Sequence, residues 1–186
     1  MQNAPCHNTV GDLMILRKLG IKGLYRPPRC SFEVFWKAPL PGWIEVNVDG
    51  ASKGNLGPAG CGAILRDFHG RTLGCFFTSC GLATSLEAEM LDVIHVIDFG
   101  RKKGWNKIWI ESDSTTIIQA IWNGTFHLAW LLTTRWMSCL DSLREINYIA
   151  THDFHEANTV ADGLANKGIN QGLSWPEELP IELLPL

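Results

Sequence analysis

Two aspartates follow short apolar stretches of the sequence, at positions where carboxylates could bind a metal ion. Asp49 ends the alternating stretch "WIEVNVD", and Asp113 ends "IWIESD". If these stretches are neighbouring parallel strands, both carboxylates emerge at the same edge of a sheet, where open α/β sheets bind their ligands. One aspartate there is a turn residue or a helix cap, whereas two together indicate a metal site.

Two predicted helices offer further carboxylates. The helix that begins near Thr84 carries Glu87 and Glu89, which flank its apolar stripe on either side, so helical geometry does not choose between them. Asp162 lies among apolar residues of the last helix, an unusual place for a charge if that face packs inward. The alternative, a solvated residue on an amphipathic helix, stays open at this point.

The elements that position these acids follow one another in a mixed order. "EVNVD" predicts a strand, and "CGAILRDF" and "RTLGCFFTS" predict a hairpin joined by "DFHG". From Thr84 the apolar period becomes helical, with Thr84 and Glu87 as a capping box. A strand, two helices, a strand and a last helix follow: "NKIWIESDS", "STTIIQAIWNG", 128–144, "INYIAT" and "ANTVADGLANKG". This order predicts an α/β fold with antiparallel hairpins followed by parallel crossovers.

Composition is ordinary for a soluble globular protein, with 46% hydrophobic and 19% charged residues in 186. No apolar run approaches the roughly 18–20 residues that cross a bilayer, so we expect no membrane partner. The net charge of −3 gives no global basic signature for nucleic-acid binding, but it leaves room for an acidic active site. None of the 6 cysteines forms a CxxC pair, which favours buried thiols in a reducing compartment, nucleus or cytoplasm, over disulfides.

Proline marks the ends of the domain. Residues 1–42 contain "YRPPRC" and "WKAPLPGW" and predict a partly disordered leader or linker with a short helix near 13–19. Residues 43–170 form the predicted domain, and 171–186 are a proline-punctuated acidic and apolar tail. The leader and the tail are the two places where we expect a protein partner to bind.

Four blocks of the sequence resemble successive blocks of a ribonuclease H domain of type 1. They are "WIEVNVDGASKGNLGPAGCGAILRD", "SLEAEMLDVIHVI", "IWIESDS" and "HDFHEANTVADGLANKG". The likeness is strongest to the plant version found in retroelement-derived and stand-alone proteins, and it covers roughly two-thirds of the chain. It implies a ribonuclease H-like fold, a five-stranded mixed sheet of strand order 3-2-1-4-5 flanked by helices.

The resemblance also implies which residues form the site. The metal-binding acids of the family fall on Asp49, Glu89, Asp113 and Asp162, and the "AE" pair in "EAEML" selects Glu89 over Glu87. His152, ten residues before Asp162, matches a mobile histidine that assists turnover and product release. The implied cofactor is two Mg²⁺ ions, with Mn²⁺ as a substitute, because hard divalent ions prefer oxygen ligands.

The implied substrate is an RNA–DNA hybrid, and the implied reaction is endonucleolytic hydrolysis of its RNA strand. Gly50, Ser52, Asn55 and Thr84 match positions that contact the hybrid, with Gly50 approaching a 2′-hydroxyl. Asn158 matches an asparagine before the final helix that orders its loop. For each of these, a structural role in the loop is as good an interpretation as substrate contact.

Departures from the family pattern keep two alternatives open. Ser85 and Leu86 stand where many members have Asn-Asn, and no lysine-rich handle follows the middle helix. These changes favour a catalytically weak or inactive module that binds nucleic acid or protein. A 3′-to-5′ exonuclease of the same superfamily is the other alternative, which the glycine-rich hairpin after Asp49 and the position of His152 disfavour.

Overall fold

The computed structural model of the chain describes residues 10–20, 36–124 and 130–171. The chain divides into two units, residues 1–33 and 34–186. In the first unit the structure describes one helix, α1 (Val10–Lys18), close to the helix predicted near 13–19. Most of the predicted leader, 1–42, and of the predicted tail, 171–186, lies outside the described residues, and both remain predictions.

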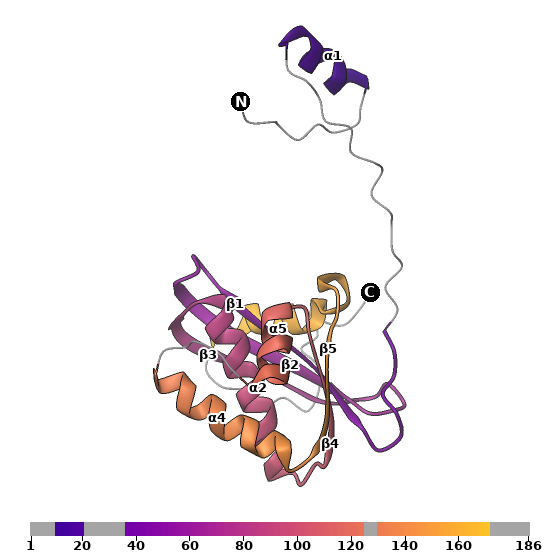
Figure 1. Cartoon of the computed structure of the whole chain (residues 1–186), viewed down its shortest axis with the longest axis vertical. Coiled ribbons are helices and arrows are strands. Elements are labelled where there is room, and N and C mark those ends of the chain that lie inside the picture. The colour runs from indigo at the N-terminus through magenta and orange to yellow at the C-terminus, as the bar shows by residue number, and fades with distance from the viewer. Residues whose placement is uncertain (1–9, 21–35, 125–129, 172–186) are drawn as a thin grey trace. The chain divides into compact units, whose positions relative to one another are not determined.

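The second unit is built on a five-stranded sheet of order β3-β2-β1-β4-β5, as the resemblance implied (Figure 1). The β1–β2 and β2–β3 pairs are antiparallel, and the β1–β4 and β4–β5 pairs are parallel. The strands are β1 (Ile44–Ser52), β2 (Gly57–Arg66), β3 (Thr72–Ala83), β4 (Lys107–Ser112) and β5 (Asn147–His152).

The helices follow the predicted order. They are α2 (Ser85–Lys102), α3 (Thr115–Asn123), α4 (Trp130–Arg144) and α5 (Thr159–Gly168), with a 3-10 turn, η1 (His155–Ala157), before α5. The capping box predicted at the start of α2 is present, because the Thr84 hydroxyl accepts the Glu87 amide while the Glu87 carboxylate accepts the Thr84 amide. Of the helix predicted over 128–144, residues 128 and 129 lie outside the described part. In the described residues, no helix has the length and apolar character needed to span a membrane.

Alternation along β2 separates the two faces of the sheet. Cys61, Ala63 and Leu65 pack into the main core with Met90 and other residues of α2, α3 and α4. Ile64 points the other way and packs with Leu164 of α5. The sheet is therefore covered by α2 on one face and by α5 on the other, and each of these two helices carries one of the predicted acids.

Glycines on β2 let α5 lie directly on the strand. A Cβ atom added to Gly62 would lie 2.5 Å from Leu164 Cβ and 2.6 Å from the Ala165 amide nitrogen. One added to Gly60 would lie 2.4 Å from the Ile169 nitrogen. Because backbone on both sides leaves no room for a side chain, the position of α5, and with it that of Asp162, depends on these two glycines.

The polar side of β1 is buried as well as its apolar side. Glu45 is fully buried, and its carboxylate accepts a hydrogen bond from the Trp36 indole at 2.5 Å. Asn47 donates to Glu111 of β4 at 3.0 Å and accepts from Arg66. Burial raises the pKa of Glu45 to about 8, against the opposing hydrogen bond from Trp36. Trp36, inside the predicted leader, thus contacts the domain directly.

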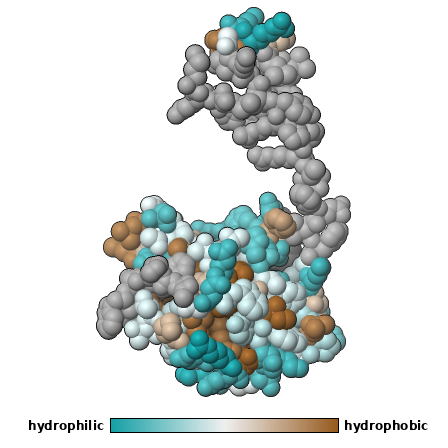
Figure 2. All heavy atoms as spheres, viewed as in Figure 1, coloured by the Kyte–Doolittle hydropathy of each residue, from teal (hydrophilic) through white to brown (hydrophobic). Residues whose placement is uncertain are grey.

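The described cysteines are mostly buried. Cys61, Cys75, Cys80 and Cys139 are free thiols, and all except the half-buried Cys80 are buried; Cys6 and Cys30 lie outside the described residues. Figure 2 shows hydrophilic and hydrophobic residues interspersed over the viewed face of the domain. The apolar core therefore lies inside the sheet–helix layers.

Gly62→Ala should destabilise the domain, because the new methyl group collides with the α5 backbone. Overpacking of this kind costs about 1–3 kcal/mol. Chemical denaturation of Gly62→Ala should show this loss, whereas Leu82→Ala, at a side chain that is 77% exposed on β3, should change stability by less than about 0.5 kcal/mol. Equal stabilities of Gly62→Ala and the wild type would mean that α5 does not pack as closely as described.

Candidate active site

Asp49 and Asp113 meet where β1 and β4 run side by side. The last residue pair of the two parallel strands is Val48 with Ser112, so both aspartates lie one step beyond it. One sequence-based expectation is corrected here: β1 does not end at Asp49 but runs on to Ser52, because Gly50, Ala51 and Ser52 keep pairing with β2. Asp49 therefore sits within a strand and has a fixed backbone, while Asp113 begins a turn.

Glu89 reaches the same place from α2. A Cβ on Gly50 would lie 2.2 Å from the Glu89 amide nitrogen, so β1 and α2 are in backbone contact beside Asp49. Glu87, the alternative that helical geometry left open, is engaged in the capping box. Glu89 Oε2 is buried and has no hydrogen-bond partner in the described part of the chain. An unpartnered buried carboxylate oxygen is costly, and a cation would satisfy it.

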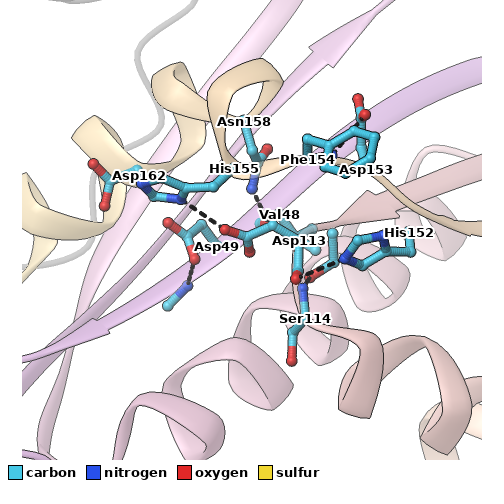
Figure 3. Close-up of polar contacts among 12 residues, drawn as sticks. Val48, Asp49, Asp113, Ser114, His152, Asp153, Phe154, His155, Asn158 and Asp162 are labelled. Carbon is cyan, nitrogen blue, oxygen red and sulfur yellow. Dashed lines mark hydrogen bonds and ion pairs between the residues drawn. The ribbon is translucent and has the colours of Figure 1, made fainter. Parts of the chain in front are cut away.

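Asp162 is held beside the other acids through Asn158. The Asn158 side chain, only 1% exposed, donates to the Val48 carbonyl at 2.9 Å and so ties the start of α5 to β1 (Figure 3). Asp162 lies in the first turn of α5, and one of its carboxylate oxygens accepts a hydrogen bond from Asn166. In this structure the buried Asn158 amide joins the start of α5 to β1, and its predicted contact with a substrate stays a prediction.

Electrostatics show that these carboxylates act on one another. The pKa of Asp49 rises to about 7, first through burial and then through the negative charges of Asp113, Asp162 and Glu89, against one lowering hydrogen bond from Gly50. The pKa of Glu89 also rises to about 7, through burial and the charge of Asp113, although Ser114 opposes the shift. Four carboxylates from four different elements therefore share one region of negative potential.

Asp49 has a further buried carboxyl behind it, which sequence reasoning missed. Asp92 of α2 is fully buried and accepts the Asp49 main-chain amide at 2.9 Å. Burial raises the pKa of Asp92 well above its usual range. Asp92 stands in an apolar helical stretch, "EMLDVIHVI", and its place three residues after Glu89 is the signal that could have pointed to the site.

Two histidines lie in the loop between β5 and α5, and the sequence singled out only one. His152 Nε2 lies 3.1 Å from the main-chain oxygen of Asp113 and does not pair with its carboxylate. His155 Nδ1 lies 2.7 Å from Asp113 Oδ2, an ion pair that Figure 3 shows. The Asp113 hydrogen bond raises the pKa of His155. The segment "HDFHEAN" contains both histidines, but its sequence alone does not show which of them contacts the Asp113 carboxylate.

The predicted substrate-contacting residues lie at the end of β1, in the loop that follows it and at the N-cap of α2. The Ser52 hydroxyl donates to the Ala83 carbonyl at 2.7 Å. Asn55, at a positive φ of 50°, accepts the Ser85 amide at 3.1 Å, which joins the loop after β1 to the start of α2. The structure therefore brings Gly50, Ser52, Asn55 and Thr84 together, and at least Ser52, Asn55 and Thr84 make hydrogen bonds within the fold.

The carboxylates are neighbours without forming a closed metal cage. Among the described residues, no group of three or more His, Cys, Asp or Glu side chains is gathered tightly enough to hold a metal ion. His155 pairs with one oxygen of Asp113. The donor set nevertheless suits a hard divalent cation, because it consists of carboxylate oxygens that repel one another when no cation is bound.

Comparison with known proteins agrees with this geometry. The sequence pattern of the reverse transcriptase-like family matches residues 47–168. A protein of Arabidopsis thaliana that carries the provisional name ribonuclease H protein is 32% identical over 152 residues, which are 80% of this chain and 24% of the relative. The chain thus spans about a quarter of that relative's length. Ribonuclease H of Polynucleobacter asymbioticus is 28% identical over 150 residues, covering 70% of this chain and 92% of the bacterial protein.

Solved structures show the same fold. The ribonuclease H1 of Halobacterium salinarum superposes with a TM-score of 0.63 at 25% identity, over 69% of this chain and 98% of the archaeal one. LC11-RNase H1, solved in complex with an RNA/DNA hybrid, gives a TM-score of 0.61 at 25% identity, over 68% and 96% of the two chains. Residues 47–168 include β4, most of β1 and the helices α2 and α5, and the chain belongs to the reverse transcriptase-like family with the fold of ribonuclease H.

Proposed function

We propose that the protein is a divalent-metal-dependent endonuclease that hydrolyses the RNA strand of RNA–DNA hybrids. The observation that carries this proposal is that Asp49, Glu89, Asp113 and Asp162 lie close enough for their charges to interact, with Glu89 Oε2 buried and unpartnered among the described residues. A fold that gathers such charges destabilises itself unless a cation neutralises them. The relatives named ribonuclease H, and the hybrid complex of LC11-RNase H1, support the choice of substrate.

Asp49, Glu89, Asp113 and Asp162 would hold the metal, and Mg²⁺ fits them best because it prefers carboxylate oxygens and keeps several waters. When bound, two such ions would supply an activated water and neutralise the charge that develops on the phosphate and the leaving oxygen. Glu89, with one buried oxygen unpartnered, would orient the attacking water. Asp49 would be the rigid ligand, since its amide is fixed by Asp92 and its carboxylate accepts the Gly50 amide at 2.8 Å.

His155 and the metal would compete for the same carboxylate. The protonated imidazole satisfies Asp113 when no cation is present, and its raised pKa shows that the pair favours this charge. A cation at Asp113 would displace His155 toward the solvent. His152, on the other side of Asp113, keeps the role in turnover that the resemblance implies.

The end of β1 and the loop after it would meet the RNA strand. The resemblance assigns Gly50 a contact with a 2′-hydroxyl, the group that distinguishes RNA from DNA. In this structure Gly50 is buried and its open side faces the Glu89 backbone, so that contact would have to come from its main-chain polar groups. Ser52, Asn55 and Thr84 hold this loop against α2, and the exposed Asn55 has an amide nitrogen left to donate to a substrate. The overall negative charge means that few phosphates are neutralised, so binding should be weak and should depend only shallowly on salt.

The first test is cleavage of an end-labelled RNA–DNA hybrid with blocked ends, in Mg²⁺ and in Mn²⁺. We expect internal cuts in the RNA strand of the hybrid and none in single-stranded or duplex RNA. Asp113→Asn should lower the rate by at least about a hundredfold, the usual scale for losing one charged group at a reacting centre. Asp141→Asn, at an exposed acid on α4 that pairs with Arg144, is the matched control and should cut normally.

The two alternatives give different results in the same assay. An exonuclease would release single nucleotides from free ends and leave the blocked hybrid uncut. An inactive module would bind hybrid without cutting it over the whole range of Mg²⁺ and Mn²⁺. Either result contradicts the proposed endonuclease.

Substitution of the two histidines should have different effects on how the cleavage rate depends on Mg²⁺ concentration. His152→Ala should lower multiple-turnover rates by roughly ten- to a hundredfold, as expected for a group that assists proton transfer or release. His155→Ala should instead lower the Mg²⁺ concentration needed for half-maximal rate, because the competing ion pair with Asp113 is lost. Mg²⁺ titrations of both variants decide the point. Loss of turnover in His155→Ala alone would assign the turnover role to His155.

Without divalent ions, the protein should lose stability as the pH rises. The pKa of Asp49 rises from 3.8 to about 7 on folding, so the unfolded chain ionises first and gains relative stability between these values. Asp49→Asn removes this effect. In chelator, the variant should therefore melt several degrees above the wild type at pH 8, and the gap should shrink toward pH 4.

Thermal melts of wild type, Asp49→Asn and Asp141→Asn over this pH range provide the measurement. Added Mg²⁺ should raise the melting temperature of the wild type at pH 8 and that of Asp141→Asn equally, but should have little effect on Asp49→Asn. If the melting temperatures of the wild type and Asp49→Asn change with pH in parallel, the pKa of Asp49 is not raised in the folded protein, and the prediction is wrong.

A further inference from the structure

A run of positive charge lies at the end of the domain away from the acids. Residues 101–107, "RKKGWNK", contain no Asp or Glu and carry four cations, here called the basic end: Arg101, Lys102, Lys103 and Lys107. α2 ends and β4 begins in this stretch, whereas the acids lie where α2 begins and β4 ends. Lys102 follows Glu89 along α2, and at 1.5 Å per residue the helix separates them by about 20 Å.

The basic end carries more charge than the helix needs. Arg101 and Lys102 lie in the last turn of α2, where cations offset the helix dipole. Lys103 and Lys107 lie beyond the helix, and Lys103 Nζ is 5.4 Å from the centre of the Phe99 ring. Of the four cations only Lys107 is half-buried, and among the described residues none of them forms an ion pair. A chain of net charge −3 thus has a local positive surface that attracts anions.

A cavity of about 210 Å³ adjoins the basic end, between the end of α2 and the residues that follow α4. Its lining includes three polar and three apolar side chains: Arg101, Ser142, Glu145, Ile97, Trp105 and Ile146. Pockets for drug-sized ligands measure roughly 300–1,000 Å³, so this one suits a single ring system.

Trp105 is a rigid wall of the cavity. Its amide donates to the Gly100 carbonyl at 2.9 Å, and Gly104, at a φ of +70°, turns the chain between them. A Cβ atom on Gly100 would lie 3.1 Å from Trp105 Cε3, and the Phe99 ring meets the indole edge-on at 5.3 Å. The half-buried indole therefore packs on α2 and also lines the cavity. Fixed aromatic rings beside cations are the surfaces on which unpaired bases stack.

The polar lining selects among bases. The Arg101 guanidinium can only donate hydrogen bonds and the Glu145 carboxylate can only accept them, and in the described part of the chain neither forms an ion pair. Guanine offers two neighbouring acceptors, O6 and N7, to an arginine fork and an amino group to an acceptor. A base inside a duplex is stacked and paired, so only an unpaired guanine could enter.

We propose that the basic end and its cavity bind a single-stranded nucleic acid that contains guanine. The phosphates lie against Lys102, Lys103 and Lys107, and one guanine stacks on Trp105 with Arg101 and Glu145 at its edges. This site is separate from the acids and goes beyond the proposed cleavage, which it neither requires nor performs.

Fluorescence anisotropy with the full-length protein in EDTA tests the base. The labelled probes are an oligouridylate of about 12 nucleotides, the same strand with one central guanosine, and the matching pair of DNA strands. We expect the guanosine strand to bind about tenfold more tightly than the oligouridylate, within the range of one bidentate base contact. An equal preference in DNA shows that the site contacts base and phosphate alone, and a larger preference in RNA adds a contact to the 2′-hydroxyl.

Glu145→Ala should abolish this preference while raising the affinity for oligouridylate slightly, because a negative charge is lost near the phosphates. Asp141→Asn also removes an exposed negative charge, but from the Arg144 pair on α4 rather than from the cavity. This control should keep the roughly tenfold preference for guanosine.

Salt dependence tests the phosphate contacts. In the Lys102→Gln/Lys103→Gln double variant, the slope of log affinity against log salt concentration should become shallower by about 1.4, since each phosphate contact on a single strand contributes roughly 0.7. Arg17→Gln/Lys18→Gln removes two exposed cations from α1 and is the matched control, which should keep the wild-type slope.

The contrary results are distinct. Equal binding of the two RNA strands by the wild type, or a guanosine preference that survives Glu145→Ala, overturns the guanine site. A slope that stays unchanged in Lys102→Gln/Lys103→Gln overturns the phosphate contacts. Because no divalent ion is present and no cleavage is measured, failure of the proposed nuclease would leave these results intact.

Discussion

The candidate site depends on the parallel pairing of β1 and β4, which brings negative charges together. The two strands pair in register up to Val48 and Ser112, and the residue that follows each of these two is an aspartate. α2 and α5 then add one acid each from opposite faces of the sheet. Every other feature of the site serves this arrangement: the backbone contact at Gly50, the close approach of α5 at Gly62, and the tether from Asn158 to Val48.

Gathering these carboxylates destabilises the folded protein when they are ionised. Burial and the neighbouring negative charges disfavour ionisation, which is why the pKa values of Asp49 and Glu89 are raised. Groups of the protein itself stabilise these negative charges in part. The Gly50 amide donates to Asp49, the His155 imidazole pairs with Asp113, and the Asn166 side chain donates to Asp162. None of these groups carries the double positive charge of a divalent ion, and this shortfall is the physical basis of the proposed cation site.

Much of this could be predicted from the sequence, because local patterns determine the elements. Alternation in "EVNVD", the capping box at Thr84 and the apolar strand before Asp113 indicated the elements and their order, and the parallel pairing placed two acids together. Helix periodicity did not separate Glu87 from Glu89, and only the family resemblance chose between them. The structure supplies a physical reason for the choice, since Glu87 is used by the cap.

Other features could not be predicted, because they depend on contacts between distant segments. The pairing of His155 with Asp113 joins residues 42 positions apart, and the burial of Asp92 depends on the main chain of β1. The end predicted for β1 at Asp49 was wrong because pairing with β2 outweighs the turn preference of Asp-Gly. The dipeptide Asp49-Gly50 alone favours a turn, whereas hydrogen bonding to β2 keeps these residues in the extended strand conformation.

Trp36 has a consequence for where this domain begins as a folding unit. Its indole is the donor that meets the buried Glu45 carboxylate, and its ring stacks over the Arg66 guanidinium at 5.5 Å. A chain shortened to start at residue 43 would lose Trp36 and so expose the Glu45 carboxyl and the Arg66 guanidinium to water. Trp36 therefore belongs to the same compact unit as the sheet, and a truncation that preserves this cover has to begin before it.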